Sequence, residues 1–132
     1  MAEITKEDMI PLLVEASPKF KPTWEEFCEE WKDEKEGMPY YTCLGDYASY
    51  LVEKLESADT AEFKEAFEVI ENLHLNGDSY VKEAATVGLL EGIQNVAGDK
   101  SDLFFPFLLP ETSRWWKKLN QFWEEGKLLT DE

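Results

Sequence analysis

The stretch DTAEFKEAFEVIENLHLNGDSYVKEAATVGLLEGIQNV, residues 59–96, decides the fold class. A stop signal lies in its middle at Asn76-Gly77, because both residues tolerate the left-handed backbone conformation. Asp78 follows and is placed to cap a second helix. The stretch therefore predicts two antiparallel helices joined by a very short connection. The first helix repeats apolar residues at helical spacing, namely Phe63, Ala66, Phe67, Ile70 and Leu73.

The second helix of this pair is rich in small side chains. Ala84, Ala85, Gly88 and Gly92 stand among its larger apolar residues. Small side chains let a neighbouring backbone approach closely, so we expect this helix at the centre of the molecule. The pair also resembles one unit of a HEAT or armadillo array, although such arrays show their period several times.

The rest of the chain carries further helix signals. A Thr5-x-x-Asp8 capping box opens a helix that ends near Ala16, and Pro11 predicts either a kink or a later start near Ile10. No window alternates apolar and polar residues as a strand does. We therefore predict one all-α domain, residues 1–132, built as a compact bundle of six to seven helices. The other expected elements are a helix that starts near Thr23 with a Thr23-x-x-Glu26 box, a helix over roughly 41–55, an Asp59 cap before Phe63, a short apolar segment over 103–109, and a helix over about 111–125 ended by Gly126.

The chain combines strong negative charge with an aromatic composition that permits a core. It has 29 acidic and 13 basic residues, a net charge of −16, five Trp, eight Phe and five Tyr. Disordered acidic chains are poor in aromatics, so this chain is expected to fold and to present a negative surface. Such a surface repels nucleic acid and anionic membranes and attracts basic proteins. We expect a basic protein partner, no nucleic acid, no membrane, and a monomer when the protein is free.

The sequence also predicts a cytoplasmic location. Its first residues lack the basic and apolar regions of a secretory signal. The longest apolar run, residues 103–109, is interrupted by Pro106 and is far shorter than the ~20 residues of a membrane span. Cytosolic thiols stay reduced, so Cys28 and Cys43 are expected to be free core or boundary residues.

No arrangement of residues points to catalysis or to a cofactor. One histidine and two distant cysteines do not supply the four ligands of a structural zinc site. The calcium loop is missing from the sequence, and the two Glu-x-x-His motifs that a di-iron bundle needs cannot form around a single histidine. His74 has no nucleophile pattern nearby and is interpreted as a helix-terminal residue that favours the dipole. Arg114, beside Trp115, is expected to pair with an acid or to stack on an indole. We therefore predict no enzyme, no metal and no cofactor.

The densest run of charge lies on the helix expected after Thr23. It is relieved only by Lys32 and Lys35, and pairs such as Glu25 with Glu29 repel each other one turn apart. A solvated helix face explains such a run without any function. The alternative is a docking surface for a basic partner. The carboxylates of this run are Glu25, Glu26, Glu29, Glu30, Asp33, Glu34 and Glu36.

A segment with exposed-type aromatics follows the acidic run directly. Met38, Tyr40 and Tyr41 lie beyond Gly37 in a region rich in helix breakers. Tyrosines beside carboxylates are typical of the surfaces that supply binding hot spots. The simpler interpretation is a loop whose rings cover the core. Our hypothesis places the partner-binding surface on this segment and the adjoining acidic helix.

Four short motifs, taken in order, carry a family resemblance. They are Phe20-x-x-x-Trp24, Leu44-Gly45-Asp46-Tyr47, Gly77-Asp78-Ser79-Tyr80-Val81 and the run Leu109-Pro110-Glu111-Thr112-Ser113-Arg114-Trp115-Trp116. Together they are similar to a family of small, acidic, all-helical bacterial proteins that resemble immunity proteins of polymorphic or contact-delivered toxins. The resemblance spans roughly residues 6–123 and departs from the family's pattern in the acidic insertion at 33–37.

The resemblance implies a function. It implies an inhibitor that binds a basic toxin domain, a nuclease being one candidate, and that occludes its active site. It carries over no catalytic residue. Two other hypotheses stay open at this point: a helical adaptor or scaffold for a non-toxin protein, and a mimic of nucleic acid.

Overall fold

The computed structural model describes residues 3–34 and 37–126, and these residues are helical almost throughout. The all-α prediction is confirmed: within those two ranges the backbone forms no strand, and Ile4 and Gly77 make an isolated parallel bridge. The helices are α1 (Lys6–Ala16), the 3₁₀ turn η1 (Pro18–Phe20), α2 (Lys21–Trp31), α3 (Tyr40–Glu56), α4 (Phe63–Asn76), α5 (Ser79–Glu83), the π-helical turn η2 (Ala84–Leu90), α6 (Glu91–Ala97), the 3₁₀ segment η3 (Gly98–Phe107) and α7 (Pro110–Glu125).

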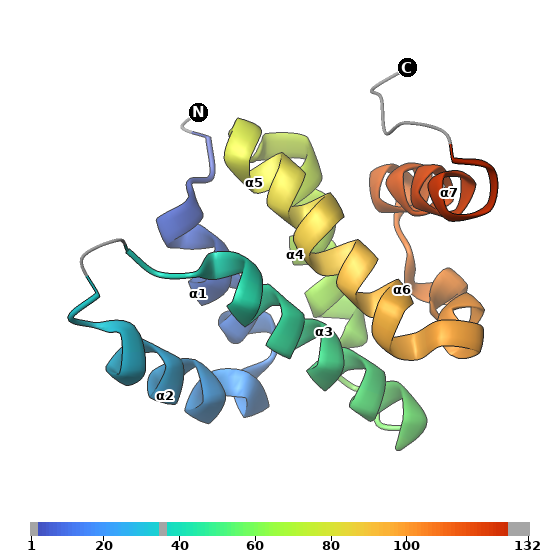
Figure 1. Cartoon of the computed structure of the whole chain (residues 1–132). Helices are drawn as coiled ribbons and strands as arrows, with labels where there is room; N and C mark the ends of the chain where they lie inside the picture. The colour runs from blue at the N-terminus through green and yellow to red at the C-terminus, as the bar shows by residue number, and fades with distance from the viewer. Residues whose placement is uncertain (1–2, 35–36, 127–132) are drawn as a thin grey trace.

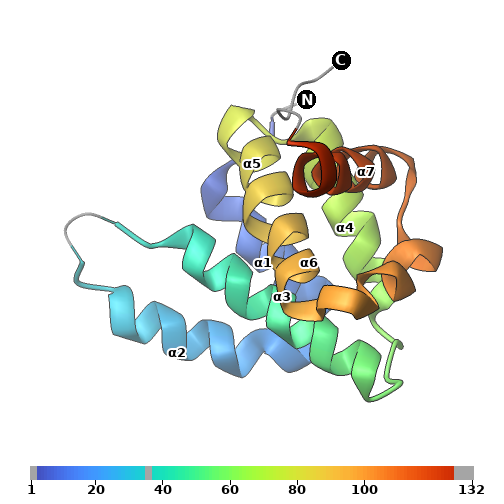
Figure 2. The same ribbon diagram turned by 45° about the vertical axis from the view of Figure 1, so that its right-hand side comes forward.

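The helices surround a central rod formed by α5, η2 and α6, which follow one another without a break. α3 packs against the rod along η2 and α6, while α4 packs against α5 and η2. α1 and α7 each pack against α4, and α2 lies at the edge of the molecule next to α3 (Figures 1 and 2). The central position predicted for the small-residue helix is therefore confirmed.

Two glycines set how closely α3 and the rod approach. A Cβ atom at Gly88 would lie 3.0 Å from the Leu44 side chain, and one at Gly92 would lie 3.2 Å from the Ala48 Cβ. Both distances are shorter than ordinary contacts between side chains, so larger residues would push the two helices apart. The small residues of the sequence thus serve the close packing of α3 against the rod.

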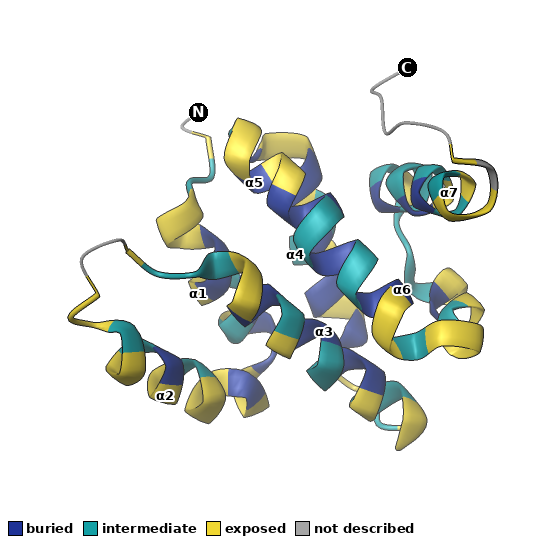
Figure 3. Cartoon of the chain, in the orientation of Figure 1, coloured by how far each residue is buried: buried dark blue, intermediate teal, exposed yellow. Residues whose placement is uncertain are grey.

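The core is aromatic and continuous. Phe63 of α4 stacks on Phe104 of η3 at a ring-centroid distance of 5.9 Å, and Phe67 lies tilted against the same ring at 6.1 Å. Tyr47 is fully buried, and its hydroxyl bonds the Ser17 hydroxyl at 2.7 Å, which joins α3 to the end of α1. In Figure 3 the buried residues line the inner faces of the helices, and exposed residues cover the outer faces. The predicted folded, ring-rich interior is confirmed.

Several predicted helix ends are confirmed by their caps. The Thr5–Asp8 capping box forms, and α1 begins at Lys6, so the alternative start near Ile10 is wrong. Asp78 accepts a hydrogen bond from the Val81 amide at 2.9 Å. Gly126 ends α7 in the left-handed conformation, with φ 69°. Each of these caps joins residues three or four positions apart, which explains why the sequence reveals them.

Two predicted helix caps are wrong. α2 begins at Lys21, near the predicted Thr23, but the Thr23-x-x-Glu26 box does not form, because η1 and Pro22 already set the helical backbone before Thr23. Asp59 does not cap α4, which begins at Phe63. Its carboxylate instead forms ion pairs with Lys19 at 3.5 Å and Lys54 at 3.4 Å.

The structural reason for a glycine at position 77 also differs from the predicted one. Its backbone is extended, with φ −73° and ψ 155°, so no left-handed stop is formed there. A Cβ atom at Gly77 would instead lie 2.4 Å from the Leu73 carbonyl oxygen and 2.5 Å from a Val81 methyl. The position requires glycine because the chain turns too tightly between α4 and α5 for any side chain.

Candidate protein-binding surface

The predicted acidic residues lie on the outer side of α2 and just after its end. Every one of these carboxylates that the structure describes is exposed. Lys32 forms an ion pair with Glu29 at 2.7 Å, and both side chains are more than half exposed, so the pair contributes little to stability. Glu36 lies outside the described residues. We call the described set the α2 face, which comprises Glu25, Glu26, Glu29, Glu30, Asp33 and Glu34.

The opposite side of α2 holds the helix on the molecule. Phe27 is buried, while Trp24 and Trp31 are half-buried and pack against the core. The Phe27 ring lies 6.1 Å from Trp24 and 6.2 Å from Trp31, so the three rings form one stripe along the helix. This stripe fixes the orientation of α2 and therefore turns its carboxylates toward solvent (Figure 3).

The three residues predicted beside the acidic run occupy the start of α3. Met38 and Tyr40 are half-buried, whereas Tyr41 is 38% exposed. The rings of Tyr40 and Tyr41 both meet Tyr80 of α5 edge to face, at 6.3 and 6.0 Å. We call Tyr40, Tyr41 and Tyr80 the tyrosine cluster. Sequence reasoning did not identify Tyr80 as a residue of the candidate surface. The signal that could have found it is its position just before Val81, outside the apolar stripe of its helix.

Charges from α1 and α5 surround the tyrosine cluster. The Lys6 ammonium lies 5.7 Å from the centre of the Tyr80 ring. Burial and the charge of Glu7 raise the pKa of Tyr40, and burial and Glu83 raise the pKa of Tyr41. Within the described ranges, the carboxylates that act on these phenols therefore belong to α1 and α5. The structure brings the tyrosines together with each other and does not join them directly to the α2 face.

His74 is buried between α4 and the rod. Its Nδ1 lies 2.9 Å from the Ile70 carbonyl, and its Nε2 lies 3.0 Å from the Thr86 hydroxyl. Burial is the main cause that lowers the pKa of His74. The predicted interaction of His74 with the helix dipole is therefore wrong, because a lowered pKa keeps the ring neutral at pH 7. The ring instead joins α4 to the rod through its two hydrogen bonds.

A pocket of about 750 Å³ lies beside His74, between the rod and the start of α7. On its α7 side the Glu111 carboxylate accepts hydrogen bonds from Arg114 at 2.9 Å and from the Trp115 indole at 3.1 Å. The guanidinium of Arg114 also lies 4.9 Å from the Trp115 ring centre. Both roles predicted for Arg114 are confirmed. Its hydrogen bond is the main cause that lowers the pKa of Glu111.

The two cysteines are free, as predicted. Cys43 is buried in α3, and burial raises its pKa to about 12. Burial and the charge of Glu25 raise the pKa of Cys28. A raised pKa keeps the reactive thiolate scarce at neutral pH, so neither side chain has the character of a catalytic nucleophile.

Comparison with known proteins assigns the chain to a family. The family described as a domain of unknown function, DUF7674, matches residues 10–124. The chain belongs to the DUF7674 family. No curated protein and no solved structure matches it. The matched range of this DUF7674 chain spans the helices from α1 to α7 and includes the α2 face and the tyrosine cluster.

Among the helices of residues 3–34 and 37–126, none combines the length and the apolar character that a membrane crossing requires.

Proposed function

We propose that the DUF7674 chain is a binding protein that captures a basic protein partner on the α2 face. The observation that carries this proposal is the run of exposed carboxylates along one outer helix, of which Glu29 alone forms an ion pair within the described residues. Retaining like charges one turn apart costs helix stability, by a few tenths of a kcal/mol per pair. A positively charged partner would relieve that repulsion on binding.

Charge and aromatic side chains would have separate roles in this interaction. Long-range attraction between the α2 face and a basic surface speeds encounter, by roughly 10–10³-fold at low salt. Affinity comes mainly from desolvated aromatic anchors near the centre of an interface. Tyr41 and Tyr80, each 38% exposed, are the side chains of the tyrosine cluster that we assign to this role.

We further propose that the partner is a toxin domain, a nuclease being one candidate, and that the chain neutralises it by covering its active site. This finer proposal is supported by the resemblance of the short motifs to immunity-like bacterial proteins. A basic nucleic-acid-binding cleft is a fitting target because it presents the positive charge that the α2 face complements.

Co-expression with the product of the neighbouring gene tests the proposal. The expected result is a complex that survives purification at low salt and a partner whose toxic activity is lost in the complex. A complex that leaves the partner fully active would support an adaptor role in place of neutralisation. The nucleic-acid mimic would be supported if the chain bound unrelated basic proteins equally well and if DNA displaced it from each of them. No complex at low salt would contradict the binding proposal itself.

A further inference from the structure

A groove of about 470 Å³ lies between α1 and α4, apart from the α2 face. The two helices pack directly on each other, and their side chains leave an open channel along the contact. The groove shares no residue with the α2 face or the tyrosine cluster. Its lining consists of Leu12, Glu15 and Ala16 from α1 and Glu65, Glu68, Val69 and Asn72 from α4.

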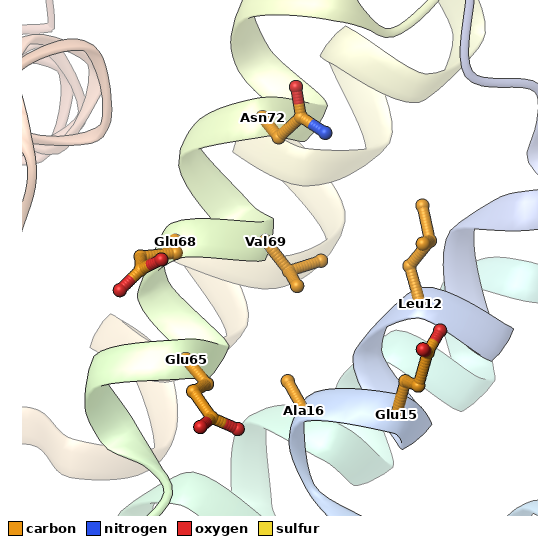
Figure 4. Close-up of a pocket in the computed structure, with 7 residues that line it drawn as sticks. All are labelled: Leu12, Glu15, Ala16, Glu65, Glu68, Val69 and Asn72. Carbon is orange, nitrogen blue, oxygen red and sulfur yellow. The ribbon is translucent and has the colours of Figure 1, made fainter.

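The groove combines an apolar floor with an acidic rim. Leu12 and Val69 are half-buried and face each other across the channel, with Ala16 between the helices (Figure 4). Glu15 and Glu65 stand on either side of Ala16, one from each helix. Leu12 and Val69 each keep part of their apolar surface in contact with water, so covering them would be favourable.

The carboxylates of the rim form no ion pair with the described residues, in contrast to Glu56 and Asp59 elsewhere on the surface. Glu56 pairs with Lys100, and Asp59 pairs with two lysines. Within residues 3–34 and 37–126, Glu15, Glu65 and Glu68 form no ion pair, and no lysine or arginine lines the groove. A ligand that complements this groove must therefore bring positive charge together with an apolar side chain.

We propose that the groove between α1 and α4 docks an amphipathic helix that carries lysine or arginine beside leucine-like residues on a partner protein. One apolar side chain of that helix rests on Leu12 and Val69, and its cations reach Glu15 and Glu65. The Glu68 carboxylate points away from α1 in Figure 4 and adds charge at the outer edge.

A helix fits this site better than an extended segment. An extended peptide binds by adding a strand to an exposed sheet edge, and the described residues contain no strand to receive one. Two helices packed side by side instead present a groove that accepts the ridge of a third helix. Residues one turn apart on that ridge can place an apolar side chain between two cations. Across the groove, Ala16 lies between Glu15 and Glu65, so the two orders match.

The probe for the test is a synthetic helix of leucine and lysine, about fifteen residues long, that has all its leucines on one face. A peptide of the same composition in scrambled order is the control ligand, because it carries equal charge without an apolar face. The protein variants are Glu15→Gln with Glu65→Gln in the groove and, as the matched control, Asp99→Asn with Asp102→Asn on η3, outside both the groove and the α2 face. Both pairs of substitutions remove the same charge from exposed positions.

The groove variant is expected to bind the amphipathic peptide about 3- to 10-fold more weakly than the wild type, as expected for the loss of two exposed ion pairs. The η3 control variant is expected to change that affinity by less than about 2-fold. Equal losses in the two variants, or equal binding of the scrambled peptide by the wild type, would overturn the proposal.

Nuclear magnetic resonance on the wild-type protein gives a second readout that needs no substitution. Addition of the amphipathic peptide is expected to shift the methyl signals of Leu12 and Val69 ahead of all others. Shifts confined to Trp24 and Trp31 would place the peptide on α2 and overturn the groove proposal. Because the neighbouring gene product is not used here, failure of this test and failure of the proposed function are distinguishable.

Discussion

The hydroxyl of Thr86 donates a hydrogen bond to the Nε2 atom of His74 across 3.0 Å. The donor is assigned because the Nδ1 atom lies 2.9 Å from the Ile70 carbonyl, which can only accept, so Nδ1 carries the proton of the neutral ring. The bond joins α4 to the π-helical turn η2 in the middle of the central rod. A second proton on His74 would turn Nε2 into a donor, so the Thr86 hydroxyl would have to accept this hydrogen bond instead of donating it, and a charge would be buried.

Acid is therefore expected to destabilise the protein through His74. Burial lowers the pKa of His74 below its ordinary 6.5, so the unfolded state takes up a proton before the folded state does. Stability from this group is complete above pH 6.5 and falls as the pH drops below that value. Urea unfolding between pH 7 and about pH 5 measures the effect. His74 is the chain's single histidine, so His74→Gln should remove most of the pH dependence in this window. An unchanged slope in the variant would contradict the assignment.

Glu71 is expected to anchor α7 on α4. Its carboxylate accepts hydrogen bonds from the Glu111 amide at 2.9 Å and from the Thr112 amide and hydroxyl at 2.8 Å each. Negative charge at a helix N-terminus is also favourable. Glu71→Ala should lower the free energy of unfolding by about 1–3 kcal/mol, because it leaves these donors unpaired. Chemical denaturation checks this, and Glu68→Ala, on the exposed side of the same helix, should change stability by less than about 0.5 kcal/mol.

Gly77 and Gly45 make a matched pair of glycine positions. A Cβ atom at Gly77 would overlap the Leu73 carbonyl at 2.4 Å, whereas one at Gly45 in α3 would meet nothing within 4 Å. Gly77→Ala should therefore lower the free energy of unfolding by about 2 kcal/mol or more, because the turn between α4 and α5 must shift. Gly45→Ala should raise it by about 0.5–1 kcal/mol, since alanine favours a helix. Urea titrations of the two variants measure both signs, and a stable Gly77→Ala protein would refute the tight turn.

The fold could be predicted largely because its signals are local. The Thr5–Asp8 box, the Asp78 cap and the final Gly126 each act over three or four residues, and each is found in the structure. Asp59 is a residue whose role such local signals do not predict. Its type and position fit a helix cap, but Lys19, forty residues away, lies close enough to pair with it. Contacts between distant segments decided the role of that carboxylate.

The candidate surface also has parts that local signals predict and parts that depend on contacts between distant segments. Helical spacing predicts that the α2 carboxylates share the exposed side of a helix, as the structure has them. The tyrosine cluster needs Tyr80 from α5, forty residues from Tyr40, and no spacing rule predicts that contact. The groove is also invisible in the sequence, because Glu15 and Glu65 face each other only after α1 packs on α4. Local charge was predictable, whereas the shape of the surface was not.

The central claim, that a basic partner docks on the α2 face, is tested most directly by association rates. The protein with Glu29→Lys and Glu30→Lys reverses the charge at the middle of that face. The control protein with Asp99→Lys and Asp102→Lys makes the same change on η3, which lies on the far side of the molecule in both views (Figures 1 and 2). Stopped-flow mixing with the neighbouring gene product at several salt concentrations gives the rates.

The α2 variant is expected to associate about tenfold more slowly than the wild type at low salt, and its association rate should depend less on salt. The η3 variant should keep a rate close to that of the wild type. Equal rates for the wild type and the α2 variant, or equal losses in the two variants, would contradict docking on the α2 face.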